Sequence, residues 1–456
     1  MSARTRGVAV ATCALVLLAT QVQAQSTPAP FSGSVVQGPA TAETLPLSLE
    51  EALRRGLTYN LGLVNLEQQV ESARGARLRA LRELLPRFEA RAGEVRQTSN
   101  LAAFGFDTSL FPGIKTLVGP YNVFDARLYA SQPVLDLSAH EDLRSRNASL
   151  EAVRFDQMNA RELVTYVVTT LYYQAVAGES RIETARSQVS TAQALFNQAT
   201  ALRNAGAAPG IDVVRSQVQL QAQRQRLIAA ENESAKQKLQ LVRAIGMPTA
   251  QQVQLTDRAL SASTPALSLE DALKQAAAAR PDYKAIQARV RAAEATLAAT
   301  RNSLWPSVRV SADYGTIGSS PSDARRTYSM SLGVRVPLFD QDRTGKQIEN
   351  TAALRQRQAE AADLAQRIEA DVRTALLDVQ AAEQQLAVAK ERVTLADQEL
   401  SLARTRFTAG VTNNLEVIQA QNEVATAADA EVAATYAVNT ARAALARAIG
   451  TPDGRR

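Results

Sequence analysis

Two stretches of the sequence decide the fold: RNAGAAPGIDVVRSQ at residues 203–217 and FTAGVTNNLEVIQAQ at residues 407–421. Each contains Ala-Gly, then a short loop, and then an acidic residue and a valine that begin a new apolar pattern. Gly206 and Gly410 stand 204 positions apart. A small turn that occurs twice at so large a spacing indicates an internal duplication.

The duplication extends through most of the sequence. LSLEEAL at 47–53 recurs as LSLEDAL at 267–273, and VRAIGMP at 242–248 recurs as ARAIGTP at 446–452. The first pair is 220 positions apart and the second pair 204. The spacing changes because the first copy has a longer loop between these motifs.

We predict the following organisation from these repeats. It consists of a signal peptide at 1–24, a flexible N-terminal tail at 25–46, a first repeat at 47–246, a linker at 247–266, a second repeat at 267–450 and a C-terminal tail at 451–456. Each repeat should contain a β-hairpin and then a helical hairpin: about 87–134 and 137–246 in the first copy, and about 307–338 and 341–450 in the second.

The composition favours long helices over a mixed globular core. Of the 456 residues 46% are hydrophobic and only 5% aromatic, and Ala, Gln, Arg, Leu and Glu dominate. The net charge is +6, but the charges are interspersed along helix-like segments, which argues against a nucleic-acid partner. Beyond the N-terminus no apolar run is long enough for a membrane-spanning helix.

The N-terminus has the pattern of a secretory signal peptide. Arg4 and Arg6 form a basic start, residues 8–19 are apolar, and small residues precede a cleavage point after Ala24. The only cysteine, Cys13, lies in this segment, where it is either an ordinary apolar residue or a lipoprotein acceptor. Cleavage leaves a chain without cysteine, so we expect neither disulfides nor thiolate metal sites.

Each copy contains two segments in which apolar and polar residues alternate. In the second copy Val308, Val310 and Ala312 alternate with Arg309 and Ser311. Period two over about ten residues fits an outer-membrane barrel strand, and it also fits a hairpin of an ordinary half-buried sheet. In the barrel interpretation the lipid-facing residues include Val308, Val310, Ala312, Leu332 and Val334.

Prolines mark the junctions between helices and strands, because proline cannot continue a helix. We predict helix-to-strand transitions at Pro86 and Pro306 and the return to helix at Pro133 and Pro337.

A strict seven-residue repeat follows the strands in both copies. Its apolar positions alternate steps of four and three from Val164 to Ala199 and from Ile368 to Phe407. Such a repeat keeps one face of a helix against a partner helix. Each segment lacks an internal proline over about 67–69 residues, which predicts helices about 100 Å long.

The two glycine turns are predicted to be the tips of helical hairpins. Gly206 and Gly410 should end the long helices in a left-handed conformation. Asp212 and Glu416 then lie near the positive N-terminus of each returning helix.

This duplicated order resembles the TolC family of outer-membrane efflux channels. The resemblance rests on the two LSLE-[ED]-AL starts, the LP and WP steps at Pro86 and Pro306, the tip RFTAGVTNNLEVIQAQ at 406–421 with its weaker copy at 203–217, and the two RAIG motifs. It covers residues 47–450. It implies a mainly α fold with a small transmembrane β part, in which three chains form one twelve-stranded barrel on an α-helical tunnel.

The resemblance also implies a function and partners. The chain would be the outer-membrane channel of a tripartite efflux or type I secretion system, a passive exit duct with its helical domain in the periplasm. The expected partners are a homotrimer, a periplasmic adaptor (membrane fusion protein), an inner-membrane pump and outer-membrane lipid. The substrate stays open among drugs, metals and proteins, since selectivity would lie in the pump.

Site residues are implied by the same resemblance. The hairpin tips, with Gly206, Gly210, Gly410 and Asn413, would dock the adaptor.

The periplasmic gate implied by the resemblance involves Asp212, Glu416, Phe407, Thr412 and Gln419. Relatives close the entrance with a tyrosine, an arginine and acids. Here Phe407 stands for the tyrosine, Thr412 for the arginine and Gln419 for a second acid. A phenyl ring donates no hydroxyl hydrogen bond and threonine makes no bidentate pair, so closure should depend more on packing. Alternatively, both acids only favour helix N-termini.

Catalytic chemistry has little support in the sequence. His140, the only histidine, is expected to be a solvated surface residue, and we predict no catalytic, cofactor-binding or metal-binding residues. We therefore expect no enzyme activity and no cofactor. The alternative function is an exported periplasmic coiled-coil adaptor or scaffold protein, which would carry one helical hairpin where this sequence predicts two.

Overall fold

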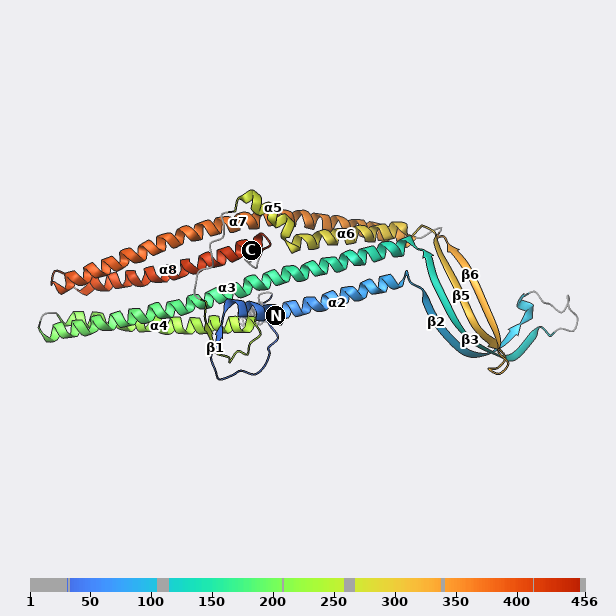
Figure 1. Ribbon diagram of the computed structural model, residues 1–456, viewed down its shortest axis with the longest axis horizontal. Helices are drawn as coiled ribbons and strands as arrows, with labels where there is room; N and C mark the ends of the chain where they lie inside the picture. Colours follow the sequence, from blue (N-terminus) through green and yellow to red (C-terminus); the bar gives the residue numbers. More distant parts are fainter. Residues whose placement is uncertain are drawn as a thin grey trace, which may run out of the picture.

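The chain forms a long rod with a β-sheet at one end and two helical tips at the other (Figure 1). The structure is a computed structural model, and it describes residues 31, 33–104, 115–206, 209–257, 267–337, 341–412 and 414–451. The predicted signal peptide with Cys13, the tip residue Asn413 and residues 452–456 of the predicted C-terminal tail lie outside the described residues.

The order of elements repeats, as the duplicated sequence predicts. The first copy contains β1 (Leu45–Leu47), α1 (Leu49–Tyr59), α2 (Leu61–Arg82), β2 (Arg87–Asn100), the 3₁₀ helix η1 (Leu101–Phe104), β3 (Leu117–Leu135), α3 (Leu137–Asn204) and α4 (Gly210–Ala244). The second contains β4 (Val253–Leu255), α5 (Leu269–Ala279), α6 (Pro281–Asn302), β5 (Ser307–Gly318), β6 (Arg325–Arg335), α7 (Gln341–Thr408) and α8 (Asn414–Ala448). Corresponding helices have equal lengths: 22 residues in α2 and α6, 68 in α3 and α7, and 35 in α4 and α8.

The first helix of each copy, α1 or α5, is short and has a serine as its N-cap. The side chain of Ser48 accepts a hydrogen bond from the first turn of α1, and that of Ser268 accepts one from the first turn of α5. Serine is favoured at this position because its hydroxyl oxygen accepts a hydrogen bond from a backbone N–H that has no partner within the helix. After a bend at Asn60 or Arg280, a second helix leads toward the sheet.

The four long strands form one antiparallel sheet in the order β2-β3-β5-β6. Residues paired across strands share a face, and Phe88 pairs with Ala130, Ala130 with Ala312, and Ala312 with Met330. One apolar face therefore crosses all four strands. Strands β2 and β6 are the free edges within one chain.

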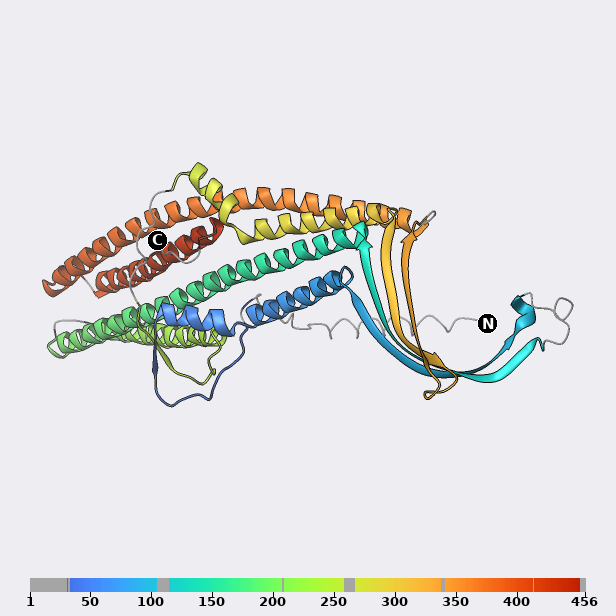
Figure 2. The same cartoon turned by 45° about the vertical axis from the view of Figure 1, so that its right-hand side comes forward.

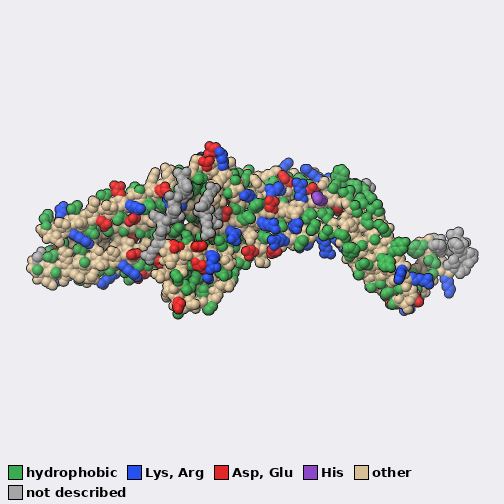
Figure 3. Space-filling model, in the orientation of Figure 1, with side chains coloured by type: hydrophobic (Ala, Val, Ile, Leu, Met, Phe, Trp, Pro, Cys, Tyr) green, Lys and Arg blue, Asp and Glu red, His purple; other side chains and the backbone are tan. Residues whose placement is uncertain are grey.

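The residues predicted to face lipid lie together on this apolar face. Val308 pairs with Val334 and Val310 pairs with Leu332, so the two strands of the second hairpin contribute to one surface. Figure 3 shows the surface as a broad hydrophobic patch over the sheet. The predicted alternation of faces is confirmed.

The opposite face of the sheet is polar and internally paired. Arg127 of β3 forms ion pairs with Asp125 at 2.7 Å and with Asp313 of β5 at 3.1 Å. The hydroxyl of Ser329 on β6 donates to the carboxylate of Asp313. This network connects three strands, and it leaves the apolar face as the side without polar partners.

The prolines lie at the ends of the strands. Pro86 directly precedes β2 and Pro306 directly precedes β5. Pro133 lies near the end of β3, where the pairing with β5 shifts register between Pro133 and Leu135. Helix α3 starts two residues after β3 ends. Pro337 follows β6, and α7 begins at 341.

The two long helices each run for 68 residues, about 100 Å. Every predicted seam position from Ile368 to Phe407 is buried or half-buried, and so is every one from Val164 to Ala199. In the half of the rod that carries the tips, α8 lies along α7, α4 lies along α3, and α3 contacts α8, so the two helical hairpins lie side by side (Figure 2). The heptad prediction is confirmed. None of the helices in the described ranges combines the length and the apolar composition needed to cross a membrane.

A small parallel sheet, which the sequence did not predict, joins the two copies. Strand β1 pairs in parallel with β4, with Leu45 opposite Val253 and Leu47 opposite Leu255. Leu47 and Leu255 are buried, and the hydroxyl of Tyr172 on α3 donates to the carbonyl oxygen of Leu47 at 3.0 Å. The described parts of the expected tail at 25–46 and linker at 247–266 are therefore attached to the helices.

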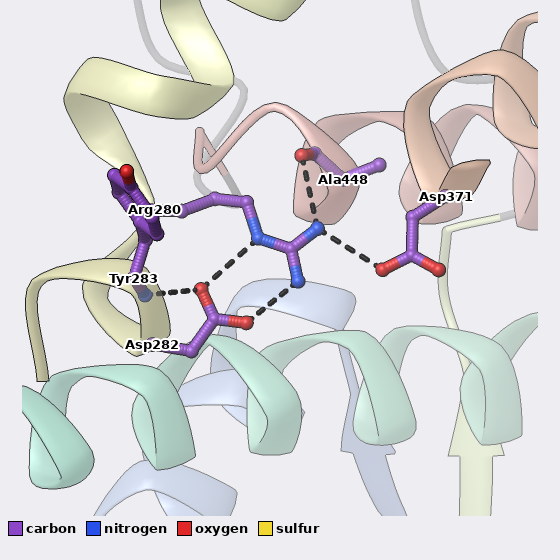
Figure 4. Close-up of polar contacts among 5 residues, drawn as sticks. All are labelled: Arg280, Asp282, Tyr283, Asp371 and Ala448. Carbon is purple, nitrogen blue, oxygen red and sulfur yellow. Dashed lines mark hydrogen bonds and ion pairs between the residues drawn. The ribbon is translucent and has the colours of Figure 1, made fainter. Parts of the chain in front are cut away.

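Arg280 holds the bend between α5 and α6 against the second helical hairpin (Figure 4). Its guanidinium donates to both carboxylate oxygens of Asp282 at 3.0 and 2.6 Å, to Asp371 of α7 at 3.1 Å and to the carbonyl oxygen of Ala448 at 3.4 Å. Burial alone would lower the pKa of Arg280, but the hydrogen bonds to Asp282 and Asp371 raise it above its ordinary value. The side chain, 8% exposed, stays charged and joins three helices.

The first copy uses an amide at the equivalent bend. Asn60 is buried, its side chain accepts a hydrogen bond from the N–H of Gly62, and it donates to the carbonyl oxygen of Phe31 at 2.6 Å. The glycine after the return helix packs on the bend in both copies. A Cβ on Gly246 would lie 2.7 Å from the Cβ of Tyr59, and a Cβ on Gly450 would lie 3.0 Å from the backbone nitrogen of Arg280.

Candidate functional site at the helical hairpin tips

The second tip ends α7 with a left-handed glycine. Gly410 has φ +74°, its N–H donates to the carbonyl oxygen of Phe407 at 3.0 Å, and the N–H of Val411 donates to that of Arg406 at 3.0 Å. These two bonds satisfy carbonyls at the helix end that would otherwise lack partners. The predicted left-handed cap is confirmed at this tip.

The long helix of the first tip also ends with a left-handed glycine. Gly206 has φ +73°, and its N–H donates to the carbonyl oxygen of Arg203 at 3.0 Å. Helix α4 then starts at Gly210, whose N-cap Pro209 provides no side-chain hydrogen bond. A Cβ on Gly206 or on Gly410 would meet nothing within 4 Å, so the backbone conformation, not the packing, requires glycine there.

The two acids of the tips have different surroundings. Asp212, in the first turn of α4, is only 4% exposed and lies 3.7 Å from Arg215. Its carbonyl oxygen accepts a hydrogen bond from the side chain of Asn414, the first residue of α8, at 3.3 Å. Asp212 therefore lies in the contact between the two hairpins, and it is not open to solvent within one chain.

Glu416 lies in the first turn of α8 and is more accessible. One carboxylate oxygen is 3.4 Å from the Arg406 guanidinium, and the other accepts a hydrogen bond from the Thr412 hydroxyl. The side chain remains 38% exposed and that of Arg406 56%. Glu416 is thus paired within its own tip while one side of the carboxylate is open to water.

The remaining gate candidates are divided between the interior and the surface. Phe407 is buried in an apolar cluster with Leu195 of α3, Leu400 and Ala403 of α7, and Val417 and Ala420 of α8. Gln419 is exposed on α8. Phe407 therefore connects the two hairpins by packing, and a gate role for these residues remains a prediction. His140 is exposed, as expected.

Amide side chains make a contact between the hairpins that was not predicted from the sequence. Gln219 of α4 donates to Asn422 of α8 at 2.8 Å, and Asn414 reaches Asp212. Gln223 and Gln421 are also buried near these residues. Because α4 and α8 run in the same direction, nearly equivalent positions of the two copies face each other. The sequence signal for this contact would have been the amide residues at interior positions of the two helices.

At both tips a left-handed glycine ends the long helix, and the acidic residue that follows is paired with an arginine. The comparisons with known proteins agree with this arrangement. The family model described as outer membrane efflux protein matches residues 53–247 and 272–451, which is most of the chain.

Individual proteins support the same assignment. The pyoverdine export outer membrane protein OpmQ of Pseudomonas aeruginosa is 24% identical over 410 residues, which cover 88% of this chain and 85% of that protein. The solved structure of the outer-membrane channel OprN has a TM-score of 0.76 at 21% identity and covers 88% of this chain and 89% of its own.

The open state of the MtrE outer membrane channel of Neisseria gonorrhoeae has a TM-score of 0.75 at 17% identity, covering 92% of this chain and 95% of its own. At these identities the solved structures establish a TolC-like fold. The duplicated fold, the apolar sheet face and the family match lead to one conclusion. The chain belongs to the outer membrane efflux protein family and is an outer-membrane channel component of an efflux system, with its helical domain in the periplasm.

Proposed function

We propose that three copies of this chain assemble into a closed duct that conducts substrates out of the periplasm. Each copy would contribute its four-stranded sheet to one barrel and its two helical hairpins to one tunnel. The observation that carries the proposal is a pair of open apolar stripes on the outer helices of the two hairpins, α4 and α7.

Helix α7 has a second apolar stripe on the side away from its own chain. Leu377, Val388, Leu395 and Leu402 occupy positions of one heptad pattern, and they are between 58% and 66% exposed. At 100° per residue, each of the four lies at least about 100° around the helix from the seam positions nearest to it in the sequence, and about 160° from one of them. The open stripe therefore needs a partner from outside the chain.

Helix α4 has a corresponding stripe. At 100° per residue its exposed apolar residues fall on one face about 100° wide. They are Ile211, Val214, Val218, Ile228 and Leu239, between 48% and 67% exposed. Buried Asp212, Ser216 and Gln219 lie on the side that faces the chain. The two open stripes thus point away from the same pair of hairpins.

A ring of copies satisfies both stripes at once, because α4 of one copy meets α7 of the next. A closed ring leaves no stripe exposed. The same closure pairs the free edges β2 and β6 of neighbouring copies, and three sheets of four strands give an even-numbered barrel with no exposed edge. The periplasmic adaptor and the inner-membrane pump complete the proposed assembly.

At the tips, we assign the aqueous side of the gate to Glu416 and the packed side to Phe407. Three copies would gather three Glu416 carboxylates near one axis, and clustered carboxylates attract cations. Asp212 is buried between hairpins and contributes less. The exposed glycines Gly206, Gly210 and Gly410 mark the proposed docking surface for the adaptor. Asn413 belongs to the same proposal through its position in the sequence.

Cysteine cross-linking tests the ring. Val218→Cys and Leu402→Cys lie at similar distances from their tips, on the two open stripes. The doubly substituted chain should form a dimer and trimer ladder on non-reducing gels of outer-membrane fractions. Pairing Val218→Cys with Arg404→Cys, which is exposed but off the stripe, is the matched control. Cross-linking that is equal in the two pairs would contradict the pairing of α4 with α7.

Planar-bilayer conductance tests the gate. Glu416→Gln should reduce cation selectivity and block by multivalent cations added from the periplasmic side. Asp212→Asn, at the equivalent turn but buried, should change both properties much less. Wild-type selectivity in Glu416→Gln would remove this carboxylate from the proposed gate while leaving the ring unaffected.

A further inference from the structure

An apolar belt surrounds the level at which the helices meet the sheet. Trp305 is 61% exposed directly before Pro306 and β5, and Leu85 is exposed directly before Pro86 and β2. Leu135 and Val336, at the ends of β3 and β6, are exposed at the same level. Exposed aromatic and aliphatic residues at this level suit the boundary between membrane and water.

An arginine lies one turn on the helical side of the belt in each copy. Arg301 precedes Trp305 by four residues, and Arg82 precedes Leu85 by three. Helix α6 ends at Asn302 and α2 at Arg82, so each arginine lies at the end of its helix, directly before the belt. Arg301 and Arg82 are both exposed, in the last turns of α6 and α2. In Figure 3 the basic side chains gather on the helices beside the hydrophobic sheet patch.

These two arginines have no carboxylate partner among the described residues, although acids lie close to them in the sequence. Glu83 pairs with Arg87 at 3.3 Å, and Asp342 pairs with Lys346 at 2.5 Å. The carboxylate of Asp136 caps α3 by accepting from the N–H of Ala139. The nearby acids are therefore occupied, which leaves the guanidinium groups of Arg82 and Arg301 for an anion outside the chain.

We propose that Arg82 and Arg301 bind the phosphate groups of phospholipids in the periplasmic leaflet of the outer membrane, while Leu85 and Trp305 contact the adjoining acyl chains. Guanidinium groups suit phosphate because their donors match its oxygens. Charge and hydrophobic contact then select the same ligand, an anionic lipid with its headgroup toward the helices. The proposal depends on the outer-membrane location and not on the number of copies in the ring.

Trp305 is the only tryptophan of the chain, so its fluorescence reports on this surface alone. The experiment uses the full chain in mixed micelles of an uncharged detergent, titrated with brominated phosphatidylglycerol or with brominated diacylglycerol, which lacks the phosphate. Phosphatidylglycerol should quench Trp305 at a lower mole fraction than diacylglycerol, and 0.5 M salt should reduce the difference.

Arginine variants locate the phosphate contact. Arg301→Gln should raise the quenching midpoint for phosphatidylglycerol about five-fold, the value for one basic side chain near an anionic lipid surface. Arg301→Lys should keep most of the effect. Arg291→Gln is the matched control, because Arg291 is an exposed arginine of the same helix and is paired with Glu151 at 2.8 Å.

Two results would overturn the proposal. One is equal quenching by the two lipids, which would show that Trp305 only touches an apolar layer. The other is wild-type quenching in Arg301→Gln while the circular dichroism and the oligomer band stay normal. Inorganic phosphate at 10 mM is added in a separate arm, and full displacement of the lipid by it would show a site for free anions, again against the proposal.

Discussion

Val310→Arg tests which side of the sheet faces lipid. Val310 lies on β5 between Gln132 of β3 and Leu332 of β6, on the apolar face that crosses the four strands. The middle of the second hairpin on this face is near Ala312 and Met330. Val310 is two residues away, about 7 Å along the strand and about 5 Å in depth at a strand tilt of about 40°.

The size of the effect follows from that depth. An arginine on the lipid face costs about 2–4 kcal/mol at the middle of the bilayer and about 0–1 kcal/mol at its edges, over an apolar band about 25 Å tall. At the depth of Val310 we expect about 2 kcal/mol for each chain, or about 6 kcal/mol for three. Since about 1.4 kcal/mol changes an equilibrium tenfold, assembly should fall by about four orders of magnitude.

The assay is the heat-modifiable oligomer band in outer-membrane fractions, with total chain measured by immunoblot. Ser311→Arg is the matched control, because it adds the same charge to the same strand one residue away, on the polar face with Arg309. We expect Val310→Arg to lose the oligomer, whereas Ser311→Arg and Arg309→Ala keep it. Equal losses in Val310→Arg and Ser311→Arg would refute the assignment of faces.

Three further changes test the tips and the bend at Arg280. Gly410→Val should destabilise the chain by only about 1–2 kcal/mol, because the left-handed backbone is strained but the Cβ meets nothing; we expect normal oligomer on gels but no efflux in a complementation assay, and wild-type efflux would exclude docking at this turn. Phe407→Ala should lower the free energy of unfolding by about 3–5 kcal/mol in urea titrations, because the ring is buried among three helices; a loss below about 1 kcal/mol would place it outside the core. Arg280→Ala should lower the free energy of unfolding by about 2–4 kcal/mol, a range kept modest because solvent weakens the ion pair with Asp371, whose side chain is 45% exposed. Adding Asp371→Ala to this variant should lower it little further, and additive losses would show that the two side chains act independently.

The repeat, the strands and the long helices could be predicted because each is a periodic signal. A pleated strand has period two and a packed helix has period 3.5, and both periods continue here over many residues. The left-handed caps at Gly206 and Gly410 depend on local backbone geometry, so a short motif was enough to predict them.

The parallel pair β1 and β4 could not be predicted in the same way. Three residues are too few to show a period, and the two strands are far apart in the sequence, at residues 45–47 and 253–255. Arg280 presents the same difficulty, since Asp371 and Ala448 are distant in the sequence and only packing brings them together.

The candidate site was predicted in part for a related reason. The sequence placed Asp212 and Glu416 in the first turns of their helices, where the structure has them. It could not tell that Asn414 of the other hairpin covers Asp212, whereas Glu416 remains accessible. The exposure of a residue near a helix start depends on the neighbouring element, and single-chain periodicity carries no information about that neighbour.

The matched helix lengths restrict how such a rod can change its reach during evolution. Helices α3 and α7 have 68 residues each and α4 and α8 have 35, so both tips end at one level. An insertion of seven residues lengthens a helix by about 10 Å and keeps its seam in phase, whereas a single inserted residue rotates the rest of the seam by about 100°. Adaptation to a wider periplasm therefore requires whole heptads in all four helices together, and length should vary in such chains by coordinated steps.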